Sequence, residues 1–213
     1  MKTAIVCAHI DDELLSCSGI ISKTNPDDLV IVYTSISEYF DLDGKQHRSR
    51  NEAISERDAS IKILCGKVTP TLLDLYYPTK EVPYNSEIIE KLDKIFRMFE
   101  IELVYTHSPS DTHSDHANTG RAVFTAARRV PNLFVFEPVF PAKSIDLYHI
   151  NAYIDISNTF DKKIKALKAQ TSQYKKYGNK WLESVECLGR LRGIESGFKY
   201  AEGFSVIRQR MII

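Results

Sequence analysis

Short apolar runs alternate with longer amphipathic segments along most of the chain. The short runs have the length and β-branched character of buried strands. The longer segments repeat their apolar residues every three or four positions, as a helix packed on one face does. Strands and helices that alternate in this way favour a mostly parallel sheet with helices on both faces. The predicted strands span residues 3–8, 29–33, 72–75, 102–106, 133–136, 154–156 and 204–207, and the predicted helices span residues 14–23, 50–65, 86–99, 117–129 and 160–174.

We therefore expect an α/β fold of the Rossmann-like type, built as a single domain over residues 1–213. A length of 213 residues is enough for one sizeable core, and no internal repeat, low-complexity tract or linker divides it. Two long polar connections, residues 35–49 and 76–85, follow predicted strands. Ligands of open α/β sheets bind beyond the carboxyl ends of the strands, so these connections are candidate walls of a site.

The composition of the chain limits the kinds of binding partner that can be expected. The 28 Lys and Arg residues balance 28 Asp and Glu residues, so the chain lacks the basic excess that binds nucleic acid or anionic membranes. No apolar stretch approaches the ~18 residues of a membrane span. The four cysteines form no closely spaced pair, which is typical of reduced thiols. We expect a cytoplasmic protein that binds neither nucleic acid nor membranes.

The first predicted strand runs directly into one histidine and three acids, His9, Asp11, Asp12 and Glu13. One acid at this place is explained as a helix cap, because a carboxylate accepts hydrogen bonds from the free amides of the first turn. Three crowded carboxylates next to an imidazole repel one another unless a cation or a proton lies among them. The cluster therefore indicates a site as well as a cap.

A second cluster follows the strand at residues 102–106 and holds three of the six histidines, His107, His113 and His116. Imidazole and carboxylate ligands suit zinc, and a catalytic zinc site needs three protein ligands and one open position. His9, Asp12 and one histidine of the second cluster meet that count. Either cluster alone is explained as a polar loop with a capping acid, so the metal interpretation depends on both occurring at strand ends.

The two clusters also resemble the metal motifs of a known family, the LmbE-like (PIG-L) de-N-acetylases. AHIDDE at residues 8–13 is similar to the motif AHPDDE, and PSDTHSDH at residues 109–116 is similar to P-x-D-x-H-P-D-H. Segments at residues 154–157, 163–167, 172–173 and 200–204 look like later parts of the family, so the resemblance covers nearly the whole chain. It implies a zinc-dependent hydrolase that removes the N-acetyl group from an N-acetylglucosamine-type sugar or sugar conjugate and releases acetate.

The resemblance implies which residues hold and use the metal. His9, Asp12 and His116 correspond to the zinc ligands, and another divalent transition metal is an alternative to zinc. Asp11 corresponds to the general base. Zinc lowers the pKa of its water toward ~7, and a carboxylate within hydrogen-bond reach takes the proton.

The remaining motif residues are expected to support the chemistry. His113 corresponds to a cationic donor to the oxyanion. Asp111 and Asp115 are expected to orient the imidazoles. A histidine that these carboxylates hold protonated could give its proton to the leaving amine, which places Asp115 among the catalytic residues. Glu13 is expected to be a helix-start or outer carboxylate, and His107 to be structural.

Three further positions affect the expected order of the motif loops or the expected contacts with substrate. Ile10 and Ser114 replace the prolines of the two motifs, and because neither proline is a ligand, metal binding is expected to survive. Arginines follow the second strand, where the family often uses one to grip its substrate, so Arg50 is the candidate substrate contact. The alternative for Arg50 is a solvated helix face.

The expected partner is a small-molecule N-acetylated sugar, and a homo-oligomer is possible. Two alternatives stay open: a metal-dependent hydrolase of another amide or ester, and a non-catalytic sugar- or metabolite-binding protein on the same fold. The intact set of motif residues argues against the second. A nucleotide-binding oxidoreductase lacks support, because no G-x-G-x-x-G motif follows the first strand.

Overall fold

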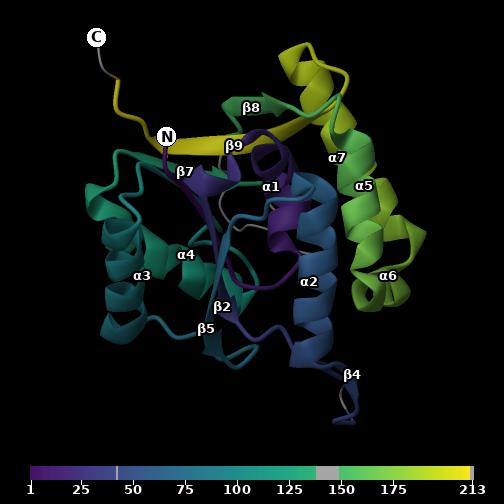
Figure 1. The fold of residues 1–213 in the computed structure, drawn as a ribbon, viewed down its shortest axis with the longest axis horizontal. Helices are drawn as coiled ribbons and strands as arrows, with labels where there is room; N and C mark the ends of the chain where they lie inside the picture. The colour runs from purple at the N-terminus through teal and green to yellow at the C-terminus, as the bar shows by residue number, and fades with distance from the viewer. Residues whose placement is uncertain (42, 138–148, 212–213) are drawn as a thin grey trace.

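The computed structural model describes residues 1–41, 43–137 and 149–211. Within these residues, seven strands form one sheet (Figure 1). The strands are β1 (Thr3–Cys7), β2 (Leu29–Ser35), β5 (Thr71–Tyr77), β6 (Leu103–Thr106), β7 (Asn132–Phe136), β8 (Ala152–Asp155) and β9 (Ala201–Arg208). Their order is β5-β2-β1-β6-β7-β9-β8. The five strands from β5 to β7 are parallel, β9 is antiparallel to β7, and β8 is antiparallel to β9.

Helices cover both faces of the sheet, which confirms the α/β prediction (Figure 1). One face is covered by α1 (Asp12–Lys23), α2 (Arg50–Cys65), α5 (Phe160–Ala169), α6 (Thr171–Tyr177) and α7 (Asn179–Ser196), and the other by α3 (Ser86–Met98) and α4 (Ser114–Ala126). Among the described residues, no helix combines the length and apolar character that crossing a membrane requires.

The central strand β1 divides the apolar interior into two cores. All five of its residues are buried, as expected for a parallel strand with helices on both sides. Ile5 and Cys7 pack in the core beneath α1, α2 and α5, whereas Ala4 and Val6 pack in the core beneath α3 and α4. The alternation follows from the strand period of two, which turns successive side chains to opposite faces.

The order of the strands places a crevice at the end of β1. The chain proceeds from β1 outward to β2 and β5, and then returns to add β6 on the other side of β1. The loops that leave β1 and β6 therefore diverge from adjacent strand ends, which is the arrangement at which open α/β sheets bind ligands. Both sequence clusters lie on these two loops and on the first turns of the helices that follow them, α1 and α4.

The structure differs from the sequence prediction in the helices after β8. The helix predicted over residues 160–174 ends at Ala169, and a second helix begins at Thr171. Between them the side chain of Gln170 is fully buried, where it accepts a hydrogen bond from Arg48 Nη2 at 2.7 Å and donates one to Ser60 Oγ at 3.1 Å. The helix therefore breaks at Gln170, where these tertiary hydrogen bonds form. The spacing of the apolar residues runs on through the break and gives no sign of it.

A helix and a short hairpin lie in segments where no element was predicted. Helix α7 contains Gly193, at which a Cβ atom would lie 2.7 Å from the carbonyl oxygen of Lys199. Glycine lowers helix propensity, but here it allows close packing. A short hairpin of β3 (Tyr39–Phe40) and β4 (Gln46–Arg48) occupies the long connection after β2.

Candidate metal centre and catalytic pocket

The turn from β1 into α1 carries the first cluster. His9 follows the strand, and Asp12 is the first residue of α1, where its Oδ2 atom accepts the amide proton of His9 at 2.7 Å. Asp11 has a φ of 131°, which is rare for a residue that carries a Cβ atom. Ile10, in the place of the motif proline, uses the amide that proline lacks, since its N–H donates to Ser37 Oγ at 2.8 Å.

The turn from β6 into α4 carries the second cluster. His113 caps α4, because its Nδ1 atom accepts the amide proton of Asp115 at 3.2 Å. Ser114 replaces the second proline and is the exposed first residue of the helix, a position that also suits proline. The loop packs closely on the helix at Gly120, where a Cβ atom would lie 2.6 Å from the carbonyl oxygen of His107.

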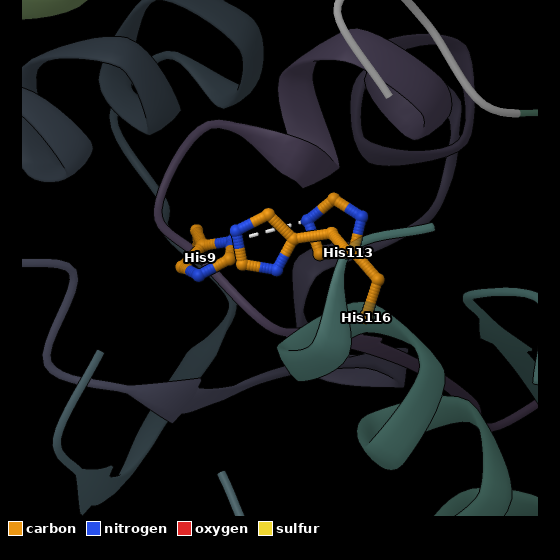
Figure 2. Close-up of side chains that lie close together, drawn as sticks. All are labelled: His9, His113 and His116. Carbon is orange, nitrogen blue, oxygen red and sulfur yellow. Dashed lines mark hydrogen bonds between the residues drawn. The ribbon is translucent and has the colours of Figure 1, made fainter. Parts of the chain in front are cut away.

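Side chains from the two turns meet at one point (Figure 2). The Nδ1 atom of His9 lies 3.1 Å from the Nε2 atom of His116. Asp12 Oδ1 lies 3.5 Å from the same Nε2 atom, and Asp12 Oδ2 lies 3.7 Å from Nδ1 of His9. Ligand atoms about 2.0–2.2 Å from a tetrahedral zinc ion lie roughly 3.3–3.6 Å apart. The three side chains therefore fit a single zinc ion, with a fourth position for water or substrate.

Two carboxylates contact the ring nitrogens of His9 and His116 that face away from the point where the side chains meet. Asp115 Oδ2 lies 3.0 Å from Nε2 of His9, and the same carboxylate accepts the amide protons of Lys80 and Val82. Asp111 Oδ2 lies 3.1 Å from Nδ1 of His116. In both rings the nitrogen turned away from the carboxylate is the one that faces the common point. This is how carboxylates orient metal-binding histidines.

The other two histidines are near enough to a metal to be considered as ligands. Side chains that could hold a metal form two overlapping groups, His9 with His113 and His116, and Asp12 with His107 and His116. Nδ1 of His113 accepts an amide proton, so in the neutral ring Nε2 carries the hydrogen and acts as a donor.

His107 is engaged in a similar way. Its Nε2 atom lies 3.0 Å from the amide of Ala8 and 3.1 Å from Asp12 Oδ2. As an acceptor from Ala8 or as a donor to Asp12, this nitrogen has no lone pair free for a metal. His107 instead stacks on His116, with ring centroids 4.1 Å apart. The geometry favours His9, Asp12 and His116 as the ligand set.

The charges of the site follow from burial and from the neighbouring groups. Burial disfavours ionisation of Asp12, but the imidazoles of His116 and His107 outweigh it and hold the pKa of this carboxyl well below its usual range. Burial and the Asp12 carboxylate raise the pKa of Asp11 well above its ordinary value, and a bound cation would lower it again. Burial, together with His9 and His116, lowers the pKa of His113 to about 4. His113 is thus neutral near pH 7, whereas the sequence suggested a cation.

A cavity of about 580 Å³ opens onto these side chains, a volume suited to a small-molecule ligand. Part of its wall is aromatic, formed by Tyr39 and Phe40 of the β3–β4 hairpin and by Tyr177 and Trp181 of α6 and α7. The ammonium group of Lys176 lies 3.6 Å from the centre of the Tyr39 ring and joins the hairpin to α6. Apolar ring faces beside polar groups suit a sugar.

The arginine that reaches the pocket is Arg48. Its guanidinium is buried and donates to the carbonyl oxygen of Ile10 at 3.1 Å, and it lies among the residues that line the cavity. Arg50, which the sequence suggested as the substrate contact, is exposed at the start of α2. Its guanidinium lies 4.0 Å from the centre of the Tyr76 ring, and it is not among the described residues that line the pocket.

Sequence reasoning also missed Glu137 as a residue of the pocket wall. Glu137 follows β7 directly, so its position beyond the carboxyl end of a parallel strand was a usable signal. Its carboxylate is held by Arg192 of α7, with Nε donating to Oε2 at 2.8 Å. Ser37 also lines the pocket and lies in the connection of residues 35–49, which was predicted as a candidate wall, but the sequence does not display its hydrogen bond to the amide of Ile10.

Known proteins resemble this chain in sequence or in structure over nearly its full length. Diacetylchitobiose deacetylase of Thermococcus kodakarensis is 23% identical in an alignment of 226 positions, gaps included, which covers 97% of this chain and 83% of that protein. The structure of N,N'-diacetylchitobiose deacetylase from Pyrococcus horikoshii, complexed with its inhibitor MPG, matches with a TM-score of 0.80 at 20% identity, over 97% of this chain and 84% of that chain.

A third match has another chemistry. GalB, the 4-carboxy-2-hydroxymuconate hydratase of Pseudomonas putida KT2440, matches with a TM-score of 0.78 at 18% identity, over 100% of this chain and 99% of that chain. At these identities the solved structures show a common fold, and the fold alone does not fix the reaction.

The sequence of residues 4–127 identifies the family. Residues 4–127 match the family model of PIG-L, described as GlcNAc-PI de-N-acetylase. This region is more than half of the chain and includes both turns of the candidate metal centre. The resemblance suggested by the two motifs is thereby confirmed, and the protein belongs to the PIG-L family of de-N-acetylases.

Proposed function

We propose that this protein is a zinc-dependent hydrolase that removes the N-acetyl group from an N-acetylglucosamine-type sugar or sugar conjugate and releases acetate. The observation that carries the proposal is the convergence of His9, Asp12 and His116 at the wall of a cavity: the two ring nitrogens lie 3.1 Å apart, and the Asp12 carboxylate oxygens lie 3.5 and 3.7 Å from them. Membership of the PIG-L family and the diacetylchitobiose deacetylase relative support N-acetyl sugars as the substrate class.

In this proposal His9, Asp12 and His116 hold the zinc ion. Bound zinc supplies Lewis-acid polarisation of the acetyl carbonyl and a lowered pKa for a water molecule. Asp11 lines the same cavity and takes one proton from the attacking water. As the carboxylic acid, Asp11 then gives that proton to the nitrogen of the breaking C–N bond, so that acetate and the free amine leave.

Two neighbouring groups assist these transfers. His113 donates a hydrogen bond from Nε2–H to the developing oxyanion, because its Nδ1 atom is occupied by the Asp115 amide. Asp115 acts on His9 through their 3.0 Å contact and touches no atom that reacts. Its role in this proposal is therefore orientation of a ligand, and the proton for the leaving amine comes from Asp11.

The experiment uses protein stripped with a chelator and reloaded with zinc. N-acetylglucosamine, N,N'-diacetylchitobiose and N-acetylglucosaminides are offered, and free amine and acetate are measured together. Asp11→Asn is expected to lower turnover by roughly 10²–10⁴-fold, with the zinc content unchanged. The matched control is Asp58→Asn, an exposed carboxylate bonded to Arg57 on α2, which should retain full turnover.

A second candidate function uses the same metal centre but acts on a bond other than the amide bond of an N-acetyl group. The second candidate is a metal-dependent addition of water to a substrate other than an amide, a reaction that the name of one structural neighbour, a hydratase, shows to occur on this fold. This candidate predicts no acetate from any N-acetyl sugar, while metal binding at His9, Asp12 and His116 remains. Absence of acetate across the panel would count against the first candidate, and equimolar acetate and amine would exclude the second.

A further inference from the structure

Two adjacent carboxylates of this chain line the same cavity from a turn that is neither regular strand nor regular helix. Asp11 and Asp12 both line the pocket. In a strand, successive side chains point to opposite faces, and on a helix they point about 100° apart. The backbone at Asp11 is neither, because its φ is 131°. Glycine adopts this region readily, but glycine has no carboxylate, so the conformation must be held by other parts of the protein.

The peptide unit between Ile10 and Asp11 is held at both of its polar groups. Its carbonyl oxygen accepts a hydrogen bond from Arg48 Nη1 at 3.1 Å. Its N–H donates to Glu13 Oε2 at 3.0 Å. A cation therefore faces the negative end of the peptide dipole and a carboxylate faces the positive end. The orientation of this peptide plane sets φ of Asp11, and rotating the plane would break both hydrogen bonds.

Both side chains of the clamp are buried, and Arg48 is held by further contacts. Glu13 is fully buried in the first turn of α1, and Arg48 is 2% exposed. Arg48 is held by Gln170 Oε1 at 2.7 Å and by Glu56 at 3.2 Å. Glu13 is not among the described residues that line the pocket. It therefore acts on the site through the backbone that it holds, without touching the substrate.

We propose that Glu13 and Arg48 are positioning residues that clamp the Ile10–Asp11 peptide and thereby aim the Asp11 carboxylate into the pocket beside Asp12. The inference rests on the proposed function, in which Asp11 moves the proton. It gives a role to the last acid of the first motif. The same clamp explains why Arg48 is buried between the turn after β1 and Gln170, the residue between α5 and α6.

The test removes the acceptor on Glu13 while keeping its size. Glu13→Met is expected to lower kcat by roughly tenfold to a hundredfold, because small displacements of a reacting group cost about that much. KM and bound zinc stay unchanged. Glu13→Gln keeps an oxygen for the Asp11 amide and is expected to stay within about threefold of the natural protein in kcat. Glu90→Met, at an exposed site on α3, is the matched control.

A double mutant separates positioning from a general effect on the fold. If Glu13 acts through Asp11, then Glu13→Met changes nothing further when Asp11→Asn is already present. A loss of the same size in both backgrounds would overturn the proposal, as would a Glu13→Gln variant as slow as Glu13→Met. So would a Glu13→Met variant with the natural kcat.

A measurement on the natural sequence keeps the proposal testable if Glu13→Met does not fold. Hydrogen exchange of the Asp11 amide in the metal-free and zinc-loaded protein should be slow, because that N–H is bonded to a buried carboxylate. A freely exchanging Asp11 amide would contradict the clamp whatever the activity. Conversely, a protected amide in a protein that releases no acetate would contradict the proposed function and leave the clamp in place.

Discussion

The Nδ1 atom of His116 lies 3.1 Å from the Oδ2 atom of Asp111, five residues earlier in the chain. This contact turns Nε2 of the same ring toward His9 and Asp12. The other oxygen of Asp111 accepts the amide proton of His113 at 2.8 Å, so the carboxylate also shapes the loop. Asp111 thus links the loop after β6 to the orientation of a proposed ligand.

Asp111→Asn is expected to weaken zinc affinity by roughly 10- to 100-fold, the usual effect of losing a carboxylate behind a metal-binding histidine. The asparagine oxygen can still accept the His113 amide proton, so the loop should keep its shape. Competition with a chromophoric chelator measures the affinity. A variant that binds zinc as tightly as the natural protein would show that Asp111 does not orient a ligand.

Zinc binding is expected to release a proton from His116. Burial lowers the pKa of His116, but the Asp12 carboxylate and the hydrogen bond with Asp111 raise it more, to about 9. The ring of the metal-free protein is therefore protonated below pH 9, and a metal binds only the neutral ring. The apparent zinc affinity should rise as the pH is raised toward 9.

An indicator dye in weak buffer at pH 7 counts the protons released on zinc addition. His116→Ala should release about one proton fewer than the natural protein, whereas His47→Ala, on the exposed hairpin, should release the same number. Equal release from the natural protein and His116→Ala would exclude His116 as the site of the displaced proton.

Arg50→Ala is expected to leave KM and kcat within about twofold of the natural values. The Arg50 guanidinium stacks on Tyr76 outside the pocket, and an exposed contact of this kind contributes only about 0.5–1 kcal/mol to stability. Steady-state kinetics on the best substrate of the panel measures both constants. A tenfold rise in KM would restore the substrate role that the sequence suggested for Arg50.

Lys163→Met is expected to destabilise the fold by roughly 3–5 kcal/mol, because it leaves Glu202 charged and buried without its partner. The Nζ atom of Lys163 lies 2.7 Å from Glu202 Oε1, and both side chains are at most 5% exposed. Urea unfolding measures the loss. Adding Glu202→Gln keeps an acceptor for the amide of Gly19 and should recover part of the stability. A double variant no more stable than Lys163→Met would argue against this ion pair as the cause.

The strands could be predicted because strands that are buried on both faces are continuous apolar runs in the sequence. β1 is buried at every position, and each strand of the seven-stranded sheet overlaps a predicted run. The division at Gln170 could not be predicted, because the side chain that fills the break bonds to Arg48 and Ser60, more than a hundred positions away. Helix α7 was missed because its glycines lower helix propensity but allow close packing.

The metal-binding chemistry was visible in the sequence because both clusters stand at strand ends. Their convergence follows from β1 and β6 being neighbours in the sheet. The geometry favours the three predicted ligands over His107 and His113 through bonds to the amides of Ala8 and Asp115, which no sequence pattern displays. The choice between Arg48 and Arg50 likewise depended on which side chain turns inward.

The most direct test of the central claim is acetate released per zinc ion bound. Chelator-stripped protein should release no acetate from N-acetylglucosamine conjugates, and activity should rise in proportion to added zinc until His9, Asp12 and His116 hold one equivalent. Each acetate should be matched by one free amine. Equal acetate release from stripped and loaded protein, or no acetate from any N-acetyl sugar at one bound equivalent, would contradict a zinc-dependent de-N-acetylase.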